Sequence, residues 1–149
     1  MNNQEEIKYD FEIIQEANDE SEIFKQTKRL LKHMLKYKFQ PSEQGTSWIN
    51  SINDANNRIN IIINRSKGVW TRFYNNNYEI NKCYNEALSE AVKETGLTYG
   101  DFPGTLFEGG EEFALSSIIN RSILKIFLLK YLNKKREGIE DKIYNKFGG

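Results

Sequence analysis

The sequence predicts an all-α protein, a single-domain helical bundle of about five helices with an added C-terminal helix. Only two prolines, Pro41 and Pro103, interrupt its 149 residues, and no segment alternates polar and apolar residues as a half-buried strand does. Apolar residues instead recur at spacings of three and four, the pattern of helices that bury one face. We expect one domain over residues 1–149, because a chain of this length can bury a sizeable core.

Two helices are predicted before Pro41. The first is short and acidic, and its apolar residues share one helical face: Ile7, Phe11 and Ile14. Asp19, followed three residues later by Glu22, predicts the N-cap of the second helix. Pro41 disfavours a helical conformation for the residue before it, so this second helix is expected to end before Gln40.

A third helix is predicted after a polar loop, with Ser47 as its N-cap. Its apolar residues again follow helical spacing: Trp48, Ile52, Ala55, Ile59, Ile62 and Ile63. A break is expected at residues 66–68, and a fourth helix over residues 70–95. Three asparagines at residues 75–77 weaken the middle of this helix, because their side chains compete for backbone hydrogen bonds. Gly96 predicts its C-cap.

The last third of the chain is predicted to be a loop followed by an apolar helix. Residues 99–110 contain four glycines and Pro103, which is typical of turns. One helical stretch is expected over residues 112–137, and it is apolar on more than one side. Gly138 interrupts it, and a short final helical turn follows, marked by Ile139, Ile143 and Phe147.

Charge is balanced overall but segregated along the chain. The formal net charge is +0, so no overall field attracts nucleic acid or a membrane surface. Residues 1–24 nevertheless carry a balance of −7 and residues 25–38 a balance of +6. The polar N-terminus and the single cysteine, Cys83, favour a soluble protein in a reducing, cytoplasmic compartment.

Few residues suggest catalysis or metal binding. His33 is the single histidine, and no partnered base or nucleophile stands at a recognisable spacing from it. One histidine and one cysteine cannot form a structural zinc site, so no metal and no cofactor is predicted. Cys83 is expected to be a buried, unreactive side chain. Glu86, Glu90 and Glu94 recur every four residues and are expected to form a solvated helix face.

The candidate binding residues are the basic side chains of residues 25–38, here called the basic face: Lys25, Lys28, Arg29, Lys32, Lys36 and Lys38. With Tyr37 and Phe39 beside them, they could contact phosphates and stack on bases. The alternative is that the basic face pairs with the acidic first helix of the same chain. A second basic group ends the apolar C-terminal helix: Lys130, Lys134, Lys135 and Arg136. Such a group can lie on a membrane surface or a partner, and the alternative is that it stabilises the helix C-terminus.

Three stretches of the chain resemble the bacterial domain-of-unknown-function family 29 over about residues 9–120. The first is LKHMLKYKFQP at residues 31–41, with Tyr37 where the family usually has tryptophan, and the second is Ser47-Trp48. The third is ETGL at residues 94–97, followed by Phe102-Pro103 and FAL at residues 113–115. The resemblance implies a small helical bundle, brings no established activity, and leaves residues 121–149 as a helical extension.

The resemblance also implies a packing signature that organises the fold, with these members: His33, Tyr37, Gln40, Pro41, Ser47, Trp48, Gly96, Phe102 and Pro103. For function, we expect a non-enzymatic protein–protein interaction or regulatory module. The alternatives are a nucleic-acid-associated protein that uses the basic face and an enzyme centred on His33. The C-terminal helix is expected either to fill a groove beside the short N-terminal helix or to pair with another copy.

Overall fold

The computed structural model describes residues 3–133 and confirms the all-α prediction. Its helices are α1 (Asn3–Phe39), α2 (Thr46–Arg65), α3 (Lys67–Tyr74), α4 (Asn77–Thr95), α5 (Leu115–Ile118) and α6 (Arg121–Lys130). Short 3₁₀ turns occupy Pro41–Glu43, Tyr99–Asp101, Phe107–Gly109 and Glu111–Phe113. The predicted final turn at residues 139–147 lies outside the described residues, as does the later part of the 121–149 extension.

The first two predicted helices are one continuous helix, α1, so the N-cap predicted at Asp19 is wrong. No proline or glycine occurs before Pro41 to end the helix. Asp19 does not cap its own backbone. Its buried carboxylate accepts hydrogen bonds from Arg65 (2.5 and 3.1 Å) and Ser66 (2.6 Å), at the far end of α2. The residue that resembled a helix start therefore joins two helices.

Pro41 ends α1 as predicted, because the last helical residue is Phe39. The next helix begins two residues earlier than expected. Gly45, in an extended conformation, is the N-cap of α2, and Ser47 lies inside the first turn. The prediction of Ser47 as the cap is therefore wrong.

The predicted fourth helix is divided into α3 and α4 by the asparagines at residues 75–77. The side chain of Asn76 accepts a hydrogen bond from the backbone N–H of Glu79 (3.2 Å) and caps α4. At the other end, Gly96 adopts a left-handed conformation (φ 74°) and caps α4 as predicted. The predicted break at Ser66 also occurs, because Ser66 lies between α2 and α3.

The predicted helix over residues 112–137 is interrupted within the described residues. Glu111–Phe113 forms a 3₁₀ turn, α5 ends at Ile118, and Asn120 accepts hydrogen bonds from the N–H groups of Ser122 and Ile123 to cap α6. As Asn76 does for α4, the Asn120 side chain accepts hydrogen bonds from backbone N–H groups, so that a new helix begins after it.

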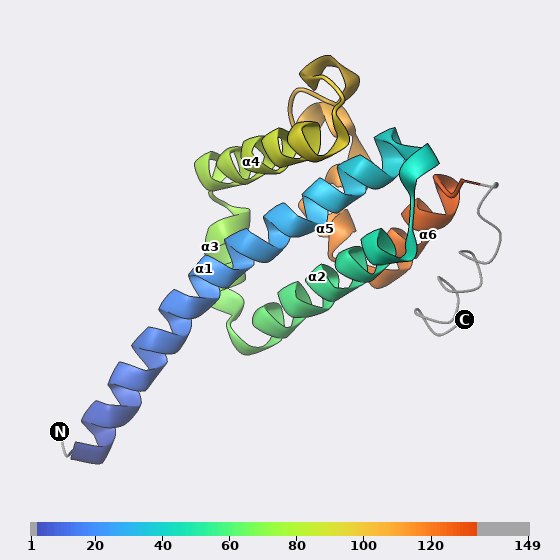
Figure 1. Ribbon diagram of the computed structural model, residues 1–149. Helices are drawn as coiled ribbons and strands as arrows, with labels where there is room; N and C mark the ends of the chain where they lie inside the picture. The colour runs from blue at the N-terminus through green and yellow to red at the C-terminus, as the bar shows by residue number, and fades with distance from the viewer. Residues whose placement is uncertain (1–2, 134–149) are drawn as a thin grey trace.

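α1 is the central element of the bundle, and the other helices pack along its second half (Figure 1). α2 runs antiparallel to α1, since Arg29 pairs with Asp54 and Asp19 with Arg65. α4 runs parallel to α1, since Cys83 contacts Phe24 and Glu94 pairs with Lys36. α6 contacts the C-terminal end of α1. The N-terminal end of α1 projects away from the bundle (Figure 1).

We expect Asp19→Ala to lower the free energy of unfolding by about 2 kcal/mol, because it removes hydrogen bonds to a buried carboxylate. The hydrogen bonds from Arg65 hold the pKa of Asp19 below its ordinary value. This contribution is therefore present above the ordinary pKa and is lost as the pH falls through the lower value of the folded protein. Urea unfolding at neutral pH and in the acid range measures both effects.

The matched control is Glu16→Ala, which removes an exposed ion pair between α1 and Arg72. It is expected to cost less than about 1 kcal/mol. Equal losses from the two variants would show that Asp19 does not join α1 to α2 in the way described.

Candidate functional site

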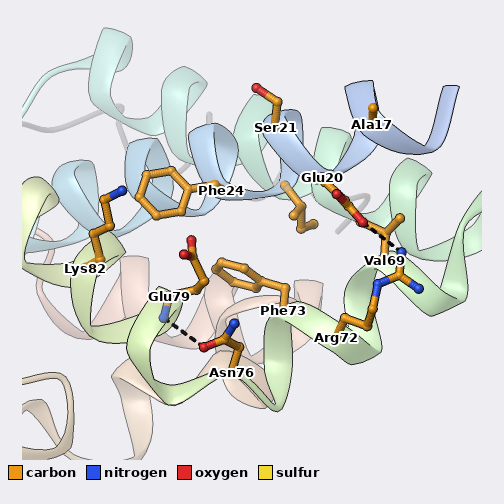
Figure 2. A pocket seen from close by; sticks show the side chains of 11 residues that line it. Ala17, Glu20, Ser21, Phe24, Val69, Arg72, Phe73, Asn76, Glu79 and Lys82 are labelled. Carbon is orange, nitrogen blue, oxygen red and sulfur yellow. Dashed lines mark hydrogen bonds and ion pairs between the residues drawn. The ribbon is translucent and has the colours of Figure 1, made fainter. Parts of the chain in front are cut away.

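A groove of about 630 Å³ lies between α1, α3 and α4 (Figure 2). Its floor is apolar, with Phe24 and Phe73 in an edge-to-face contact at 6.5 Å between ring centroids. Its rim carries charges of both signs, and Arg72 pairs with Glu20 across it at 2.9 Å. These opposite charges neutralise one another, so the groove does not concentrate a charge that would select a substrate.

A second groove, of about 820 Å³, lies beside the junction of α3 and α4. It is bordered by Tyr74, Ile80, Leu106 and Phe107, and the Phe107 side chain is 93% exposed. Its walls are mainly apolar, which suits contact with another apolar surface. Among residues 3–133, no group of three histidine, cysteine or acidic side chains is placed to hold a metal ion.

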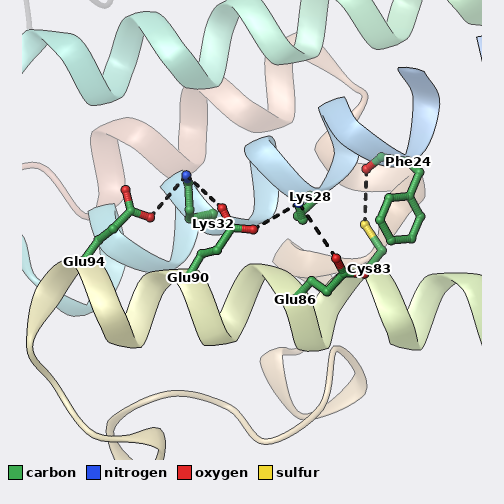
Figure 3. A network of polar contacts seen from close by, with 7 residues as sticks. All are labelled: Phe24, Lys28, Lys32, Cys83, Glu86, Glu90 and Glu94. Carbon is green, nitrogen blue, oxygen red and sulfur yellow. Dashed lines mark hydrogen bonds and ion pairs between the residues drawn. The ribbon is translucent and has the colours of Figure 1, made fainter. Parts of the chain in front are cut away.

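The basic face of α1 lies against α4, where its lysines form a ladder of ion pairs with glutamates (Figure 3). Lys28 lies 3.9 Å from Glu86 and 3.1 Å from Glu90. Lys32 lies 3.4 Å from Glu90 and 3.2 Å from Glu94. These glutamates keep about 40% of their side-chain surface exposed, so they are partly solvated as predicted, but they also pair with the lysines of α1.

The remaining members of the basic face also lie near acids or rings. Lys36 is buried, pairs with Glu94 at 3.6 Å and stands 4.8 Å from the ring centroid of Trp48. Arg29 pairs with Asp54 at 2.5 Å, and Lys38 pairs with Glu112 at 2.5 Å. Lys25 is exposed. The basic face pairs within the chain as one alternative expected, but with α4, α2 and the 3₁₀ turn at residue 112. The continuous α1 prevents its acidic end from folding back.

His33 is half-buried between these lysines, and its Nδ1 atom is buried without a hydrogen-bond partner in the described part of the chain. Burial, together with the positive charges of Lys36 and Lys32, lowers the pKa of His33 to about 4. The imidazole is therefore neutral at physiological pH. A histidine base in catalysis is commonly oriented by a carboxylate hydrogen bond, and none to His33 is formed within residues 3–133.

Several residues of the packing signature meet at the C-terminal end of α1. The buried hydroxyl of Tyr37 donates a hydrogen bond to the Leu128 carbonyl of α6 (2.7 Å), and burial raises the pKa of this phenol. The Gln40 side chain donates to the Thr95 carbonyl at the end of α4 (3.2 Å). The carbonyl of Pro41 accepts a hydrogen bond from the Asn133 side chain (3.0 Å).

The other signature residues also pack near this end. Phe102 is buried and lies edge-on to Phe39, with 5.5 Å between ring centroids. Pro103 accepts a hydrogen bond from the hydroxyl of Tyr84 (2.5 Å). Trp48 is half-buried against the core, whereas Ser47 is exposed. Apart from Ser47, the signature residues lie where α1, α2, α4, α6 and the loop at residues 97–103 meet. Their contacts pack these elements together.

Gln44, which also lies at the C-terminal end of α1, is a buried residue that no pattern in the sequence predicts. It is fully buried, and its side-chain amide donates to the carbonyls of Tyr37 (2.8 Å) and Tyr131 (2.5 Å). Its side-chain oxygen accepts from the N–H of Asn133 (2.7 Å). Its position in a polar loop suggested exposure, and only the packing of α6 over that loop explains its burial.

Cys83 is buried, and its thiol contacts the carbonyl of Phe24 at 3.6 Å. Burial raises the pKa of the thiol to about 12, so it stays protonated and unreactive at neutral pH. This agrees with the prediction of a buried, unreactive side chain.

The surface that stands out is the N-terminal part of α1, residues 3–14, which we call the arm. Every residue of the arm is exposed, and the helix projects beyond the bundle (Figure 1). Ile7 (69% exposed), Phe11 (66%) and Ile14 (59%) share one face of the arm, and Tyr9 and Ile13 share a second. Monomeric proteins rarely leave large apolar side chains clustered in this way, and such clusters mark contact surfaces.

The comparisons with known proteins give one match. The family described as "Domain of unknown function DUF29" matches residues 10–124, which is more than half of the chain. No curated protein and no solved structure matches it. The matched range includes the last residues of the arm (10–14), the basic face, every residue of the packing signature and the first residues of α6.

We expect Gln44→Ala to lower the free energy of unfolding by about 3 kcal/mol, because two buried carbonyls lose a donor and a backbone N–H loses an acceptor. Urea unfolding measures the loss, and hydrogen exchange is expected to show faster exchange in α6 than in α2. The neighbouring exposed residue provides the control: Glu43→Ala is expected to change stability by less than about 0.5 kcal/mol. Similar losses for both variants would contradict the described role of Gln44.

We expect His33 to destabilise the folded protein as the pH falls from its ordinary pKa of 6.5 to about 4. In this window the unfolded chain binds a proton that the folded protein does not, so unfolding becomes more favourable. The stability of wild type relative to His33→Gln should fall across the window by at most about 3 kcal/mol. Urea unfolding of both proteins from neutral pH to about pH 4 tests this, and a constant difference would contradict it.

Proposed function

This chain belongs to the DUF29 family, whose description assigns no activity, and we propose that it acts as a non-enzymatic protein-interaction module. The single observation that supports this function is the arm, a helical segment whose five large apolar side chains contact no core. Burying such side chains against a partner is favourable by about 25 cal/mol per Å² of apolar surface.

The arm is well suited to binding because it is already helical. An isolated helix of a dozen residues is marginal in water, since its first turn is costly to form. Here the arm continues a helix that the bundle holds in place from Gln15 onward. A partner therefore does not have to order the arm, and less of the contact energy is lost on binding.

The spacing of Ile7, Phe11 and Ile14 also matches a known recognition mode. Residues at i, i+4 and i+7 form one face of a helix, and such a face commonly lies in an apolar groove of a partner. Ion pairs of Asp19 with Arg65 of α2 and of Glu16 with Arg72 of α3 hold the base of the arm in place. Within residues 3–133, no helix is both long and apolar enough to cross a membrane.

The two alternative functions have less support. Five of the six members of the basic face lie within 4 Å of a carboxylate, which lowers the positive charge available to nucleic acid. His33 is neutral and lies among lysines, without the hydrogen-bonded carboxylate that commonly accompanies a histidine base. The buried thiol of Cys83 fits a reducing, cytoplasmic setting, which we include in the proposal.

We expect a photo-crosslinking amino acid in place of Phe11 to form adducts with protein when the chain is expressed in its native host. The control is the same substitution at Tyr78, an aromatic residue of α4 that is also exposed (73%). Gel electrophoresis and mass spectrometry identify the adducts. Adducts at position 11 and few at position 78 support the proposal. No adduct at position 11, or equal adducts at both positions, would contradict it.

A further inference from the structure

The apolar face of the arm is part of a longer, regular stripe along α1. The spacing of its residues alternates between three and four, which is the repeat of helices that pair as coiled coils. We call this stripe the seam, and all of its residues are exposed: Gln4, Ile7, Phe11, Ile14, Asn18 and Ser21. In this repeat Phe11 and Asn18 occupy a positions, whereas Ile7 and Ile14 occupy d positions. The seam therefore has the pattern with which one helix packs along another.

The charges of the arm permit a like helix on the seam. Glu5, Glu6 and Glu12 lie about 120° or more around the helix from the centre of the seam, at about 100° per residue. A helix packed on the seam therefore does not approach these carboxylates. Within the arm, the charged residues that flank the seam are Lys8 and Asp10, which have opposite signs. Two arms can consequently pack together without like charges in contact.

The residues that follow the seam select the direction of pairing. The same repeat continues into the basic face, with Lys25, Lys28 and Lys32. In a parallel pair each of these lysines would face the same residue of the other copy, and like charges repel. The two bundles would also lie side by side at one end of the paired arms. An antiparallel pair keeps the lysines and the bundles of the two copies at opposite ends, so it is the favoured direction.

We propose that two copies of this chain associate through their arms, as an antiparallel pair of helices in contact along the seam. A two-fold axis between residues 11 and 14 places Phe11 of each copy against Ile14 of the other, and Ile7 against Asn18. The proposal rests on the proposed function, since it names the partner that the arm binds. It covers the apolar side chains of the seam, which residues 3–133 of one chain leave exposed.

Asn18 limits the strength of this pair and defines its register. An asparagine at an a position specifies register and oligomeric state in coiled coils, at a cost in stability. Three apolar side chains from each arm also make a small interface, below the roughly 1,200 Å² at which stable complexes begin. We therefore expect a weak dimer, with a Kd in the micromolar range.

Sedimentation of the purified full-length chain, from low to high micromolar concentration, tests the proposal. Wild type is expected to reach twice its mass of 17.5 kDa. Phe11→Ala with Ile14→Ala removes apolar contacts from the seam and should weaken dimerisation about tenfold or more. Asn18→Leu should strengthen dimerisation about tenfold, because an apolar side chain then faces Ile7 of the other copy.

The matched control is Tyr9→Ala with Ile13→Ala, which removes apolar side chains of the same arm. These side chains are 58% and 48% exposed and lie on the face away from the seam, so dimerisation should be unchanged. Circular dichroism checks that each variant keeps its helices. A wild type that stays monomeric, a control that weakens dimerisation equally, or an Asn18→Leu variant that pairs no better would each overturn the proposal.

Disulfide formation tests the direction of pairing. Ile7→Cys mixed with Asn18→Cys should form a bond between the two variants under oxidising conditions, because residues 7 and 18 face each other only in the antiparallel pair. Neither variant should form a bond alone. Cys83 does not compete, because its thiol is buried. No bond in the mixture, or bonds between copies of one variant, would overturn the antiparallel arrangement.

Crosslinking at position 11 in cells separates this proposal from the proposed function. Adducts that contain only this chain, at twice its mass, support both. A monomeric wild type that still forms adducts with another protein overturns self-pairing alone. A monomeric wild type that forms no adduct overturns the interaction function as well.

Discussion

The continuity of α1 is the constraint on which the rest of the structure depends. Its 37 residues contain no glycine or proline, so they form a helix about 55 Å long. The helices beside it are much shorter, since α2 has 20 residues and α4 has 19. Two helices of about 30 Å cannot cover one of 55 Å. The exposed arm is therefore a consequence of unequal helix lengths, and its apolar side chains stay uncovered within the described chain.

The two ends of α1 consequently have different physical character. At the C-terminal end, Tyr37, Gln40 and Gln44 form buried or half-buried hydrogen bonds to α6, to α4 and to the loop. Buried polar groups of this kind are costly to break, because a lost partner leaves the other unsatisfied. At the N-terminal end, the side chains of the arm are solvated. One helix thus serves as a fixed support at one end and as an accessible surface at the other.

Local residue chemistry predicted much of the fold. Pro41 and Gly96 mark helix boundaries through the backbone itself, because proline lacks an N–H group and glycine permits the left-handed conformation, and the structure agrees at both. The errors have a common cause. Asp19, Ser47 and the asparagines can cap a helix or bond elsewhere, and tertiary contacts decide which. The ion pairs of Glu86, Glu90 and Glu94 could not be predicted, because their partners lie more than fifty residues away on α1. Gln44 was missed for the same reason.

The lysine–glutamate ladder between α1 and α4 has a consequence for how the two helices are aligned. Both sets of charges repeat every four residues, so sliding α4 by one turn, about 5.4 Å, would still pair two of the three lysines. The ladder therefore does not specify the register of the two helices. Register is set by contacts that do not repeat, such as that of Cys83 with Phe24 and that of Gln40 with Thr95. The repeating charges allow more than one register of α4 against α1, and the two contacts that do not repeat select one register.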